Sequence, residues 1–325
     1  VVSRRETGLH AAPEPSLDTL GGQGWRASAQ RAFLATRPQF LIAAVLPVMV
    51  GTVWGARSVG ELDATATLIA MAVAALMAAA ANVWNDVCDD ACGTDRINEE
   101  HIYPFSGGSR FIQNGILSAG SMTRLAASLA LLAFTLGVLL AWRHGWPVLG
   151  LGLSGAALGI LYSWPPVQLA GRGVGELAIA LAYGVLPVCG AAWLQSNAWE
   201  GPAFWLSVPV SAWIAAVLLI NEVPDCKADA AVGKRTLPVR IGYRATAVTY
   251  GLLHTVALTG VAGWAFASGL SLSPVAGFAA VWLVAMTAAV RLARDPSHPG
   301  LAIRLTLAVH AAGCIGLMIW MLLTA

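Results

Sequence analysis

The chain has 325 residues, of which 57% are hydrophobic and only 11% are charged. An average soluble domain carries roughly 25% charged residues, and a protein that folds in water needs more polar surface than this chain can supply. The composition excludes an ordinary water-soluble protein and predicts an integral membrane protein in contact with the lipid bilayer. The formal net charge is only +2, and we expect no nucleic acid among the partners.

The first 32 residues are polar and contain no long apolar run. They lack the apolar core of a cleavable signal peptide, so none is expected. We interpret 1–32 as a polar N-terminal tail and interfacial segment, with residues 1–20 disordered and Trp25 to Pro38 forming a short helix at the membrane surface. Residues 33–325 are predicted to form a single transmembrane domain.

Apolar runs close to the length of about 20 residues that crosses a bilayer predict an all-α fold with nine transmembrane helices. The predicted spans lie at about 39–56, 64–84, 123–142, 147–163, 175–194, 203–221, 246–267, 272–290 and 303–323.

The distribution of positive charge predicts the orientation of these spans. If the N-terminus lies inside the cell, the inner segments carry 17 of the 19 Lys and Arg residues, and the outer segments carry only Arg57 and Arg143. This bias follows the positive-inside rule. We therefore expect a multi-pass protein of the cell (inner) membrane with a cytoplasmic N-terminus. The odd number of spans places the C-terminus outside.

Acidic residues are concentrated at the cytoplasmic ends of the second and sixth predicted spans. Six of the 17 lie between Asp86 and Glu100, and three lie between Glu222 and Asp229. Each stretch has an Asn, an Asp four residues later and another Asp four residues after that; the sets are Asn82, Asp86 and Asp90, and Asn221, Asp225 and Asp229. On one α-helix this spacing keeps three side chains within about 80° of one face. The repetition predicts two related helical halves that face a shared cavity.

Carboxylates on one face at membrane depth repel each other, and their ionised forms are costly to bury. Mg²⁺ removes both difficulties, because it prefers oxygen ligands and commonly joins protein carboxylates to substrate phosphates. We therefore predict a Mg²⁺-dependent diphosphate site in which Asn amides complete or orient the ligand shell; a solvated helix end is the alternative. The predicted metal ligands are Asp86, Asp89, Asp90, Asp225 and Asp229, and the amides are those of Asn82, Asn85 and Asn221.

The loops after the two acidic stretches carry residues suited to anion binding. Residues 104–110 read Pro-Phe-Ser-Gly-Gly-Ser-Arg, a turn whose backbone N–H groups could contact a phosphate, with Arg110 adding a fixed charge. Lys234 and Arg235 follow the second stretch and are predicted to bind the diphosphate, although positive-inside bias alone could account for cations here. Tyr162, which ends the fourth span, is a further candidate for the cavity.

Other titratable residues are interpreted as structural. Glu176 opens the fifth span, where the helix dipole favours an acid. Cys88, Cys92 and His101 could be combined into a zinc site, but Cys-x-x-Cys spacing is missing and carboxylates surround them. No disulfide framework is expected on the reducing cytoplasmic side. Two histidines within spans are expected to form hydrogen bonds between helices; they are His254 and His310.

These segments resemble the UbiA superfamily of intramembrane prenyltransferases, and within it the menaquinone branch, the 1,4-dihydroxy-2-naphthoate polyprenyltransferases. The resemblance extends from about residue 35 to the C-terminus. It is carried by Arg37-Pro38, by NVWNDVCDDACGTD at 82–95, by PFSGGSRFIQNGILS at 104–118, by YSWPPVQLAGRGVGEL at 162–177 and by NEVPDCKADAAVGKRTLPVRIG at 221–242.

The resemblance implies helices around a central cavity that opens sideways to lipid, with two Mg²⁺ ions held by the two acidic motifs. Asp90 stands where the menaquinone branch often has an aromatic residue, so Asp89 and Asp90 are alternative ligands. The loop at 105–110 replaces a Gly-Pro-x-Arg type of sequence, which leaves the acceptor open. The residues that match are Asn82, Asp86 and Asp89 in the first motif, Asp225 and Asp229 in the second, and Lys234 and Arg235 in the basic pair.

The resemblance further implies transfer of an isoprenoid chain from a prenyl diphosphate to an aromatic acceptor such as 1,4-dihydroxy-2-naphthoate, as in menaquinone biosynthesis. The reaction would be dissociative, with charge on the leaving diphosphate stabilised at the metal site and the allylic carbocation captured by the ring. The implied catalytic residues are Asp86, Asp89, Asp225 and Asp229. The alternatives are a UbiA-type enzyme with a different acceptor, an intramembrane terpene cyclase, an ion-coupled transporter and a non-catalytic membrane scaffold.

Overall fold

The computed structural model describes residues 13–324, and every regular element in this part of the chain is helical. Nine of its helical segments are long and apolar enough to cross a membrane, which confirms the predicted spans and fold class. They are α3 (Leu41–Val59, preceded by η1, Pro38–Phe40), α4 (Ala64–Cys92), α6 (Ala119–His144), α7 (Trp146–Ser163), the continuous segment α8–η3–α9 (Gly175–Ser196), α10 (Gly201–Asn221), α12 (Leu237–Ala267), α13 (Val275–Arg294) and α14 (Gly300–Leu323).

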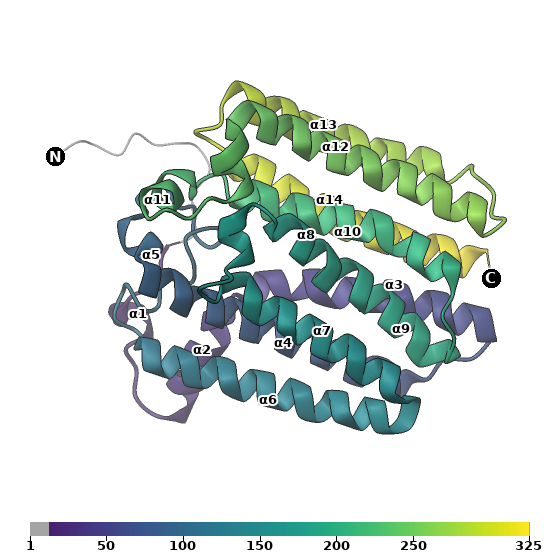
Figure 1. Cartoon of the computed structure of the whole chain (residues 1–325), viewed down its shortest axis with the longest axis horizontal. Coiled ribbons are helices and arrows are strands. Elements are labelled where there is room, and N and C mark those ends of the chain that lie inside the picture. Colours follow the sequence, from purple (N-terminus) through teal and green to yellow (C-terminus); the bar gives the residue numbers. More distant parts are fainter. Residues whose placement is uncertain (1–12, 325) are drawn as a thin grey trace.

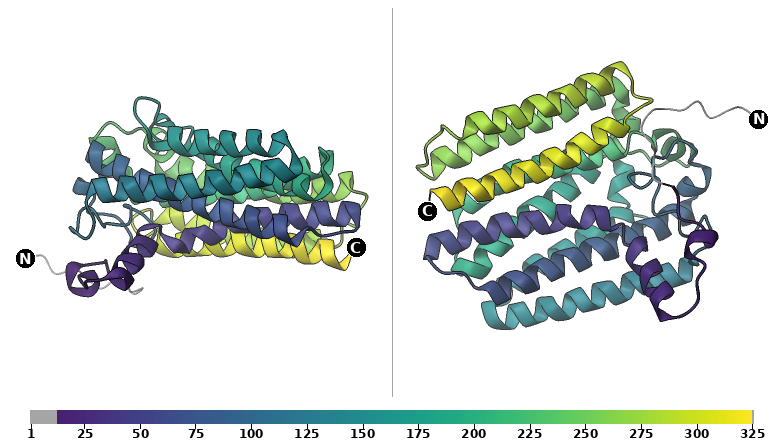
Figure 2. Two further views of the ribbon diagram at one scale, coloured as in Figure 1. Left: turned by 90° about the horizontal axis from the view of Figure 1, so that it is seen from below. Right: turned by 180° about the vertical axis from the view of Figure 1, so that it is seen from behind.

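The long helices lie side by side in a flattened bundle, with α12 and α13 along one edge and α6 along the opposite edge (Figure 1). In the view from behind, α14, α3 and α4 lie nearest the viewer, so α7 and α8 cover the opposite face (Figure 2). Four short helices gather at one end of the bundle, and α14 finishes at the other end (Figure 1). These short helices are α1 (Leu17–Leu20), α2 (Trp25–Ala35), α5 (Thr94–Ile97) and α11 (Cys226–Ala231).

The N-terminal segment differs in part from the prediction. Residues 1–12 lie outside the described residues. The expectation that 1–20 is disordered is wrong for its last part, because α1 forms there, capped by the Ser16 hydroxyl and burying Leu20. Helix α2 confirms the helix expected after Trp25. Its place at a membrane surface and the domain boundary at residue 32 stay predictions.

Helix α4 is longer than the apolar run from which it was predicted. The Asp63 carboxylate caps its start by accepting a hydrogen bond from the Ala66 N–H at 2.8 Å. Gly93 ends it with a φ of 89°, a left-handed conformation that favours glycine. The helix therefore continues beyond residue 84 and carries the first three acids of the first stretch, Asp86, Asp89 and Asp90.

The fifth span is irregular at its centre. One turn of π-helix, η3 (Leu181–Val185), lies between α8 (Gly175–Ala180) and α9 (Leu186–Ser196). Pro187 contributes to the irregularity because it has no N–H to continue the α-helical ladder. Single π turns occur frequently at functional sites, and two residues of this turn line the cavity described below.

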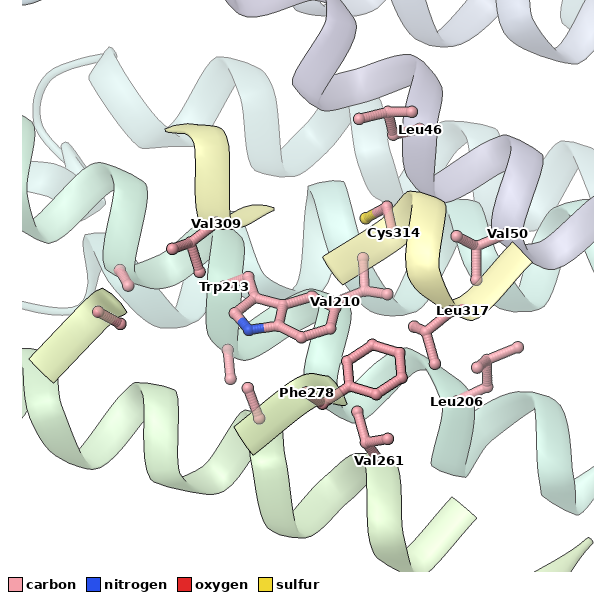
Figure 3. Close-up of a cluster of buried hydrophobic side chains, with 14 of the residues drawn as sticks. Leu46, Val50, Leu206, Val210, Trp213, Val261, Phe278, Val309, Cys314 and Leu317 are labelled. Carbon is pink, nitrogen blue, oxygen red and sulfur yellow. The ribbon is translucent and has the colours of Figure 1, made fainter. Parts of the chain in front are cut away.

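The largest apolar core lies between α3, α10, α12, α13 and α14 (Figure 3). At its centre the Trp213 and Phe278 rings stack with centroids 6.3 Å apart and an interplanar angle of 14°. Gly313 permits this packing, because an added Cβ would lie 2.5 Å from the Trp213 ring. Outward-facing side chains are apolar as well, as expected for lipid contact: Leu131 of α6 and Val248 of α12 are 66% and 64% exposed.

Candidate functional site

A cavity opens at the end of the bundle where the short helices lie, with about 1200 Å³ of empty space including its open mouth. Its polar lining includes Asn82, Asn85, Asp89, Asp95, Asn221, Glu222, Asp225, Asp229 and Lys234. Apolar residues one to two turns further along α8–η3 and α10 continue the wall; they are Ile179, Ala182, Tyr183, Ile214, Val217 and Leu218. The structure thus brings both acidic stretches to one cavity, with a polar part and an apolar part.

Asparagine side chains orient the first acidic stretch. The Asn85 amide donates to the Asp89 carboxylate and to the Ser163 hydroxyl of α7, both at 3.1 Å. Asn82, one turn earlier, donates to the Thr36 carbonyl at 2.9 Å, which ties α4 to the segment before α3. Both amides line the cavity and hold α4 against its neighbours.

Asp89 and Asp90 are adjacent in sequence but have different surroundings, because successive residues of an α-helix are rotated by about 100°. Asp89 lines the cavity. The Asp90 carboxylate instead accepts hydrogen bonds from the Arg96 guanidinium at 2.9 and 3.0 Å and from the Gln113 amide at 3.2 Å. Asp90 does not line the cavity.

Asp86 lies behind the loop that follows α5. The Ser109 N–H donates to one carboxylate oxygen at 3.0 Å, and the other oxygen is buried without a hydrogen-bond partner. The loop residue beside the Asp86 carboxylate, Gly108, has a φ of 74°, which favours glycine. A Cβ added at Gly108 would lie 3.0 Å from Asp86 and 2.7 Å from Asp95. The glycine-rich turn is expected to offer N–H groups to an anion, and in this structure two of them donate to carboxylates of the two acidic stretches.

The second acidic stretch does not lie on one continuous helix, so that part of the prediction is wrong. Helix α10 ends at Asn221, residues 222–225 form turns, and then α11 begins. The physical reason is Pro224, which has no N–H and whose ring clashes with the preceding helical turn. Asp225 and Asp229 nevertheless both line the cavity.

Asp225 is held by groups from the first half of the site. The Asn98 amide donates to one oxygen at 2.6 Å, and the Gly107 N–H donates to the other at 3.2 Å. Burial raises the pKa of Asp225 above its ordinary value and raises the pKa of Asp229 to about 7. Both carboxyl groups are therefore costly to ionise unless a cation accompanies them.

Lys234 connects the two acidic stretches. Its ammonium group lies 3.0 Å from Asp89 and 3.5 Å from Asp229, and its side chain is only 10% exposed. Burial by itself lowers the pKa of Lys234, but the two carboxylates outweigh burial and raise it well above its ordinary value. A fixed positive charge therefore stands between the acidic groups of the cavity.

Asp95 is a site residue that the sequence analysis did not select. It lines the cavity from α5, and one of its carboxylate oxygens is buried without a hydrogen-bond partner. Burial, together with the charges of Asp89 and Asp86, raises the pKa of Asp95 to about 8. Its place at the end of the acidic segment 82–95 is the signal that could have identified it.

The predicted cationic residues separate into two groups. Lys234 lines the cavity, whereas Arg110 and Arg235 do not. The Arg110 guanidinium donates to the Asp95 carbonyl, so it supports the loop from behind. The Arg235 side chain is exposed.

Arg37 supplies a second cation to the lining, and sequence reasoning missed it as a site residue. It has a φ of 57°, its guanidinium donates to the Phe105 carbonyl at 2.9 Å, and its Nε is buried without a partner. Its position before Pro38, at the entry to the first span, gives no signal of this conformation. Tyr162 also lines the cavity, at the position expected for it.

Two glutamates are buried in or near the polar lining. Glu222 lines the cavity, and Glu176 occupies the first turn of α8, as expected. Both oxygens of Glu176 are buried without hydrogen-bond partners, which is unusual for a simple helix cap. Burial, and then the charge of Glu176, raise the pKa of Glu222 well above its ordinary value.

The interhelical histidines behave differently from each other. A ring nitrogen of His310 lies 3.3 Å from the Ala43 carbonyl of α3, in keeping with the expected contact between helices. His254 has no hydrogen-bond partner, so the expectation is wrong for this residue. Its ring packs instead against Tyr250, with centroids 4.5 Å apart.

The zinc alternative lacks an assembled site, and all five cysteines are free thiols. Within residues 13–324, no three His, Cys, Asp or Glu side chains come close enough to hold a metal ion by themselves. His101 instead contacts the Asn98 carbonyl and the Glu14 carboxylate, both at 2.8 Å.

The donor set does fit Mg²⁺ shared with a diphosphate. One oxygen each of Asp86 and Asp95 is buried without a hydrogen-bond partner, and unpaired hard oxygen donors are the ligands that Mg²⁺ prefers. Mg²⁺ usually takes only one or two protein carboxylates and completes its shell with water and substrate phosphate. Carboxylates spread around a cavity therefore suit an ion that arrives with its diphosphate.

Known proteins similar to this chain share most of its length. The sequence profile of the UbiA prenyltransferase family matches residues 44–322. "UbiA prenyltransferase domain-containing protein 1" of Dictyostelium discoideum is 30% identical over 227 residues, which cover 69% of this chain and 68% of that protein. The 1,4-dihydroxy-2-naphthoate octaprenyltransferase of Bacillus subtilis is 26% identical over 245 residues, covering 73% and 76%.

A solved structure has the same fold. A UbiA homolog from Archaeoglobus fulgidus bound to GPP and Mg²⁺ matches with a TM-score of 0.60 at 14% identity, covering 87% of this chain and 99% of that one. The profile match and the relatives confirm the resemblance and the enzyme class, a prenyltransferase. The chain therefore belongs to the UbiA prenyltransferase family.

Proposed function

We propose that the cavity binds a prenyl diphosphate together with Mg²⁺ and transfers the prenyl chain to an aromatic acceptor of the 1,4-dihydroxy-2-naphthoate type, as in menaquinone biosynthesis. The single observation that carries the proposal is that both acidic stretches, joined by Lys234, line one cavity whose deeper wall is apolar. Such a cavity suits a ligand with a diphosphate at one end and a hydrocarbon chain at the other. The names of the curated naphthoate octaprenyltransferase relatives support the choice of acceptor.

The acidic residues would hold the metal ions. Asp89, Asp95, Asp225 and Asp229 line the cavity. Asp86 lies behind the loop after α5, and one of its oxygens has no hydrogen-bond partner. When bound, Mg²⁺ would neutralise the charge that develops on the leaving diphosphate. Asp90 is engaged by Arg96, so the geometry favours Asp89 over Asp90 as the ligand.

The cations and amides would position the substrate. Lys234 can donate to diphosphate oxygens at the moment the allylic C–O bond breaks, a form of stabilisation that acts on developing charge. Arg37 is a second donor in the same lining. Asn85 would orient the Asp89 carboxylate, and Asn82 and Asn221 would add polar groups to the lining. The allylic carbon then forms a bond to an electron-rich ring carbon, and for a dihydroxynaphthoate the ring loses carbon dioxide.

We place the site on the cytoplasmic side of the cell (inner) membrane. Support comes from the two cations assigned to the outer side, which lie at the end of the bundle opposite the cavity. Arg57 donates to the Met321 and Thr324 carbonyls at the end of α14, and Arg143 lies 3.7 Å from Asp63 at the start of α4. Accessibility of single cysteines introduced beside each end would test the orientation.

The test of the proposed function is product formation by purified protein in lipid nanodiscs. Prenyl diphosphate and Mg²⁺ would be supplied with 1,4-dihydroxy-2-naphthoate, with 4-hydroxybenzoate or with no acceptor, and products identified by mass spectrometry. A prenylated naphthalene formed only with the first acceptor is expected. A prenylated benzoate would indicate a different acceptor, and a hydrocarbon or alcohol without acceptor would indicate a cyclase or hydrolase.

A further inference from the structure

The segment between α5 and α6, residues 98–118, holds one of the cavity carboxylates in place. We call this segment the ligand-holding loop. Its Asn98 amide and its Gly107 N–H donate to the two oxygens of Asp225, at 2.6 and 3.2 Å. Hydrogen bonds from neighbouring groups orient metal ligands, and losing one commonly weakens metal binding about 10–100-fold. Whatever fixes the loop therefore affects the metal affinity of the site.

His101 contacts both of the residues that hold Asp225. Its Nδ1 lies 2.8 Å from the Asn98 carbonyl oxygen, which can only accept a hydrogen bond, so the Nδ1–H donates. Its side chain also packs against Gly107, where φ is 69° and an added Cβ would lie 2.9 Å from the His101 Cγ. The His101 side chain is only 12% exposed. His101 thus restrains the loop at Asn98 and at Gly107 together.

Glu14, from the segment before α1, contacts the other side of the His101 ring. Its Oε1 lies 2.8 Å from His101 Nε2. The Asn114 amide of the ligand-holding loop donates to the Pro15 carbonyl at 2.8 Å and to Glu14 Oε2 at 3.4 Å. Burial by itself raises the pKa of Glu14, but the hydrogen bonds from His101 and Asn114 outweigh burial and lower it. The ionised glutamate is therefore the form that this contact favours.

The chain around Glu14 is packed against the loop. Leu20 of α1 is 8% exposed and belongs to the same buried apolar cluster as Phe111 and Ile116 of the loop. The Arg31 guanidinium of α2 donates to the Leu20 carbonyl at 3.0 Å, which joins α2 to α1. Both helices lie at the same end of the bundle as α5 and α11 (Figure 1). Packing of α1 therefore keeps Glu14 beside His101.

We propose that Glu14 and His101 are positioning residues of the metal site, which act through Asn98 and Gly107 on Asp225. The inference rests on the proposed function, in which Asp225 is a Mg²⁺ ligand. If either residue is removed, the loop holds Asp225 in the binding geometry for a smaller fraction of the time, and the apparent Mg²⁺ affinity falls by that fraction. Saturating Mg²⁺ should restore turnover, because neither side chain contacts the reacting atoms.

Glu14→Ala, His101→Ala and the double variant test the contact. Asp18→Ala is the matched control: Asp18 is an exposed acid of α1, and its carboxylate forms no hydrogen bond or ion pair with residues 13–324. Glu14→Gln is the conservative variant, since an amide can donate to or accept from a ring nitrogen and so keeps the contact.

The first measurement is the Mg²⁺ concentration that gives half-maximal prenyl transfer by full-length protein in nanodiscs. His101→Ala should raise it about tenfold, and Glu14→Ala roughly two- to fivefold, as for a partly exposed ion pair. The double variant should match His101→Ala, because both residues act through one contact. Glu14→Gln and Asp18→Ala should stay within about twofold of wild type. Additive losses, or losses of turnover that saturating Mg²⁺ does not restore, would overturn the proposal.

Hydrogen exchange followed by mass spectrometry tests the contact without ligand or turnover. Peptides covering residues 98–110 should exchange faster in Glu14→Ala and His101→Ala than in wild type and Asp18→Ala, while peptides of α10 keep their wild-type rates. Unchanged exchange of the loop in both variants would overturn the proposal. If wild-type protein showed no Mg²⁺-dependent transfer, the proposed function itself would fail, and the exchange rates would still decide whether Glu14 and His101 hold the loop.

Discussion

The Lys234 ammonium group lies 3.0 Å from the Asp89 carboxylate, although the two residues are 145 positions apart in the chain. Their side chains are only 10% and 12% exposed, so the pair is largely removed from water. Removing one partner of such a buried pair leaves an uncompensated charge. A substrate diphosphate would compete with Asp89 for the same ammonium group, which makes this contact the natural place to perturb the site.

Lys234→Gln should lower kcat/KM for prenyl diphosphate about 10²–10³-fold, because it removes a positioned donor to the leaving group. Arg235→Gln is the matched control, since Arg235 is exposed and does not line the cavity. An exposed substitution of this kind should change kcat/KM by less than about threefold. Steady-state kinetics on both variants measure the difference. Equal losses would show that the cavity is wrongly assigned, and that both members of the basic pair contact substrate.

Asp89→Asn and Asp90→Asn should have unequal effects even though both keep the side-chain shape. Asp89 faces the cavity, and its substitution should remove nearly all Mg²⁺-dependent turnover. Asp90→Asn loosens the pair with Arg96, whose side chain is 65% exposed, and should cost at most about 1 kcal/mol of stability. Turnover measured against Mg²⁺ concentration separates the two. The assignment fails if Asp90→Asn shifts the Mg²⁺ requirement as strongly as Asp89→Asn.

Gly108→Ala should weaken Mg²⁺ binding, because the added Cβ would lie 2.7 Å from Asp95 and 3.0 Å from Asp86. The loop must then move away from the two carboxylates. Gly115→Ala is a close control: its φ of 69° resembles the 74° of Gly108, but no atom lies within 4 Å of its added Cβ. Both variants should lose roughly 1 kcal/mol from backbone strain, and only Gly108→Ala should lose Mg²⁺ affinity by calorimetry. Equal Mg²⁺ affinities in the two variants would contradict the proposed role of the loop.

Mg²⁺ affinity should increase with pH. Burial raises the pKa of Asp229 to about 7 and that of Asp95 to about 8. A raised folded-state pKa means that these groups stabilise the metal-free fold at low pH and lose that contribution as the pH rises through 7 to 8. Metal binding needs the ionised forms, so it must release protons, most of all near and below these pKa values.

Calorimetry in two buffers of different protonation enthalpy counts the released protons. We expect release at pH 7 and less release at about pH 9, with Asp95→Asn releasing fewer protons than wild type. Affinity that falls between pH 6 and 9 would contradict the assignment of these carboxyl groups as ligands.

The sequence predicts those features that depend on local pattern. Apolar run length gives all nine spans, and the concentration of acids locates both halves of the site. It does not separate Asp89 from Asp90, because that choice depends on how α4 is rotated within the bundle. The four-residue spacing from Asn221 to Asp229 wrongly predicts one continuous helix, because Pro224 interrupts the helix.

Other site features depend on tertiary packing that no local pattern contains. Asp95 and Arg37 enter the lining only because the chain turns after α4 and before α3. In the sequence, Glu176 has the position of an ordinary acidic residue in the first turn of a helix. Its burial near Glu222 results from the packing of α8 against α10.

The most direct test of the central claim is pyrophosphate release by the purified protein from a polyprenyl diphosphate. It would be measured with 1,4-dihydroxy-2-naphthoate present, with Mg²⁺ and then with EDTA, in wild type, Asp89→Ala and Asp225→Ala. We predict that pyrophosphate release requires both Mg²⁺ and the naphthoate. Release should be lost in both variants, because each removes a carboxylate from one of the two acidic stretches. Release that persists in EDTA, or in both variants, would contradict a metal-dependent transfer at this cavity.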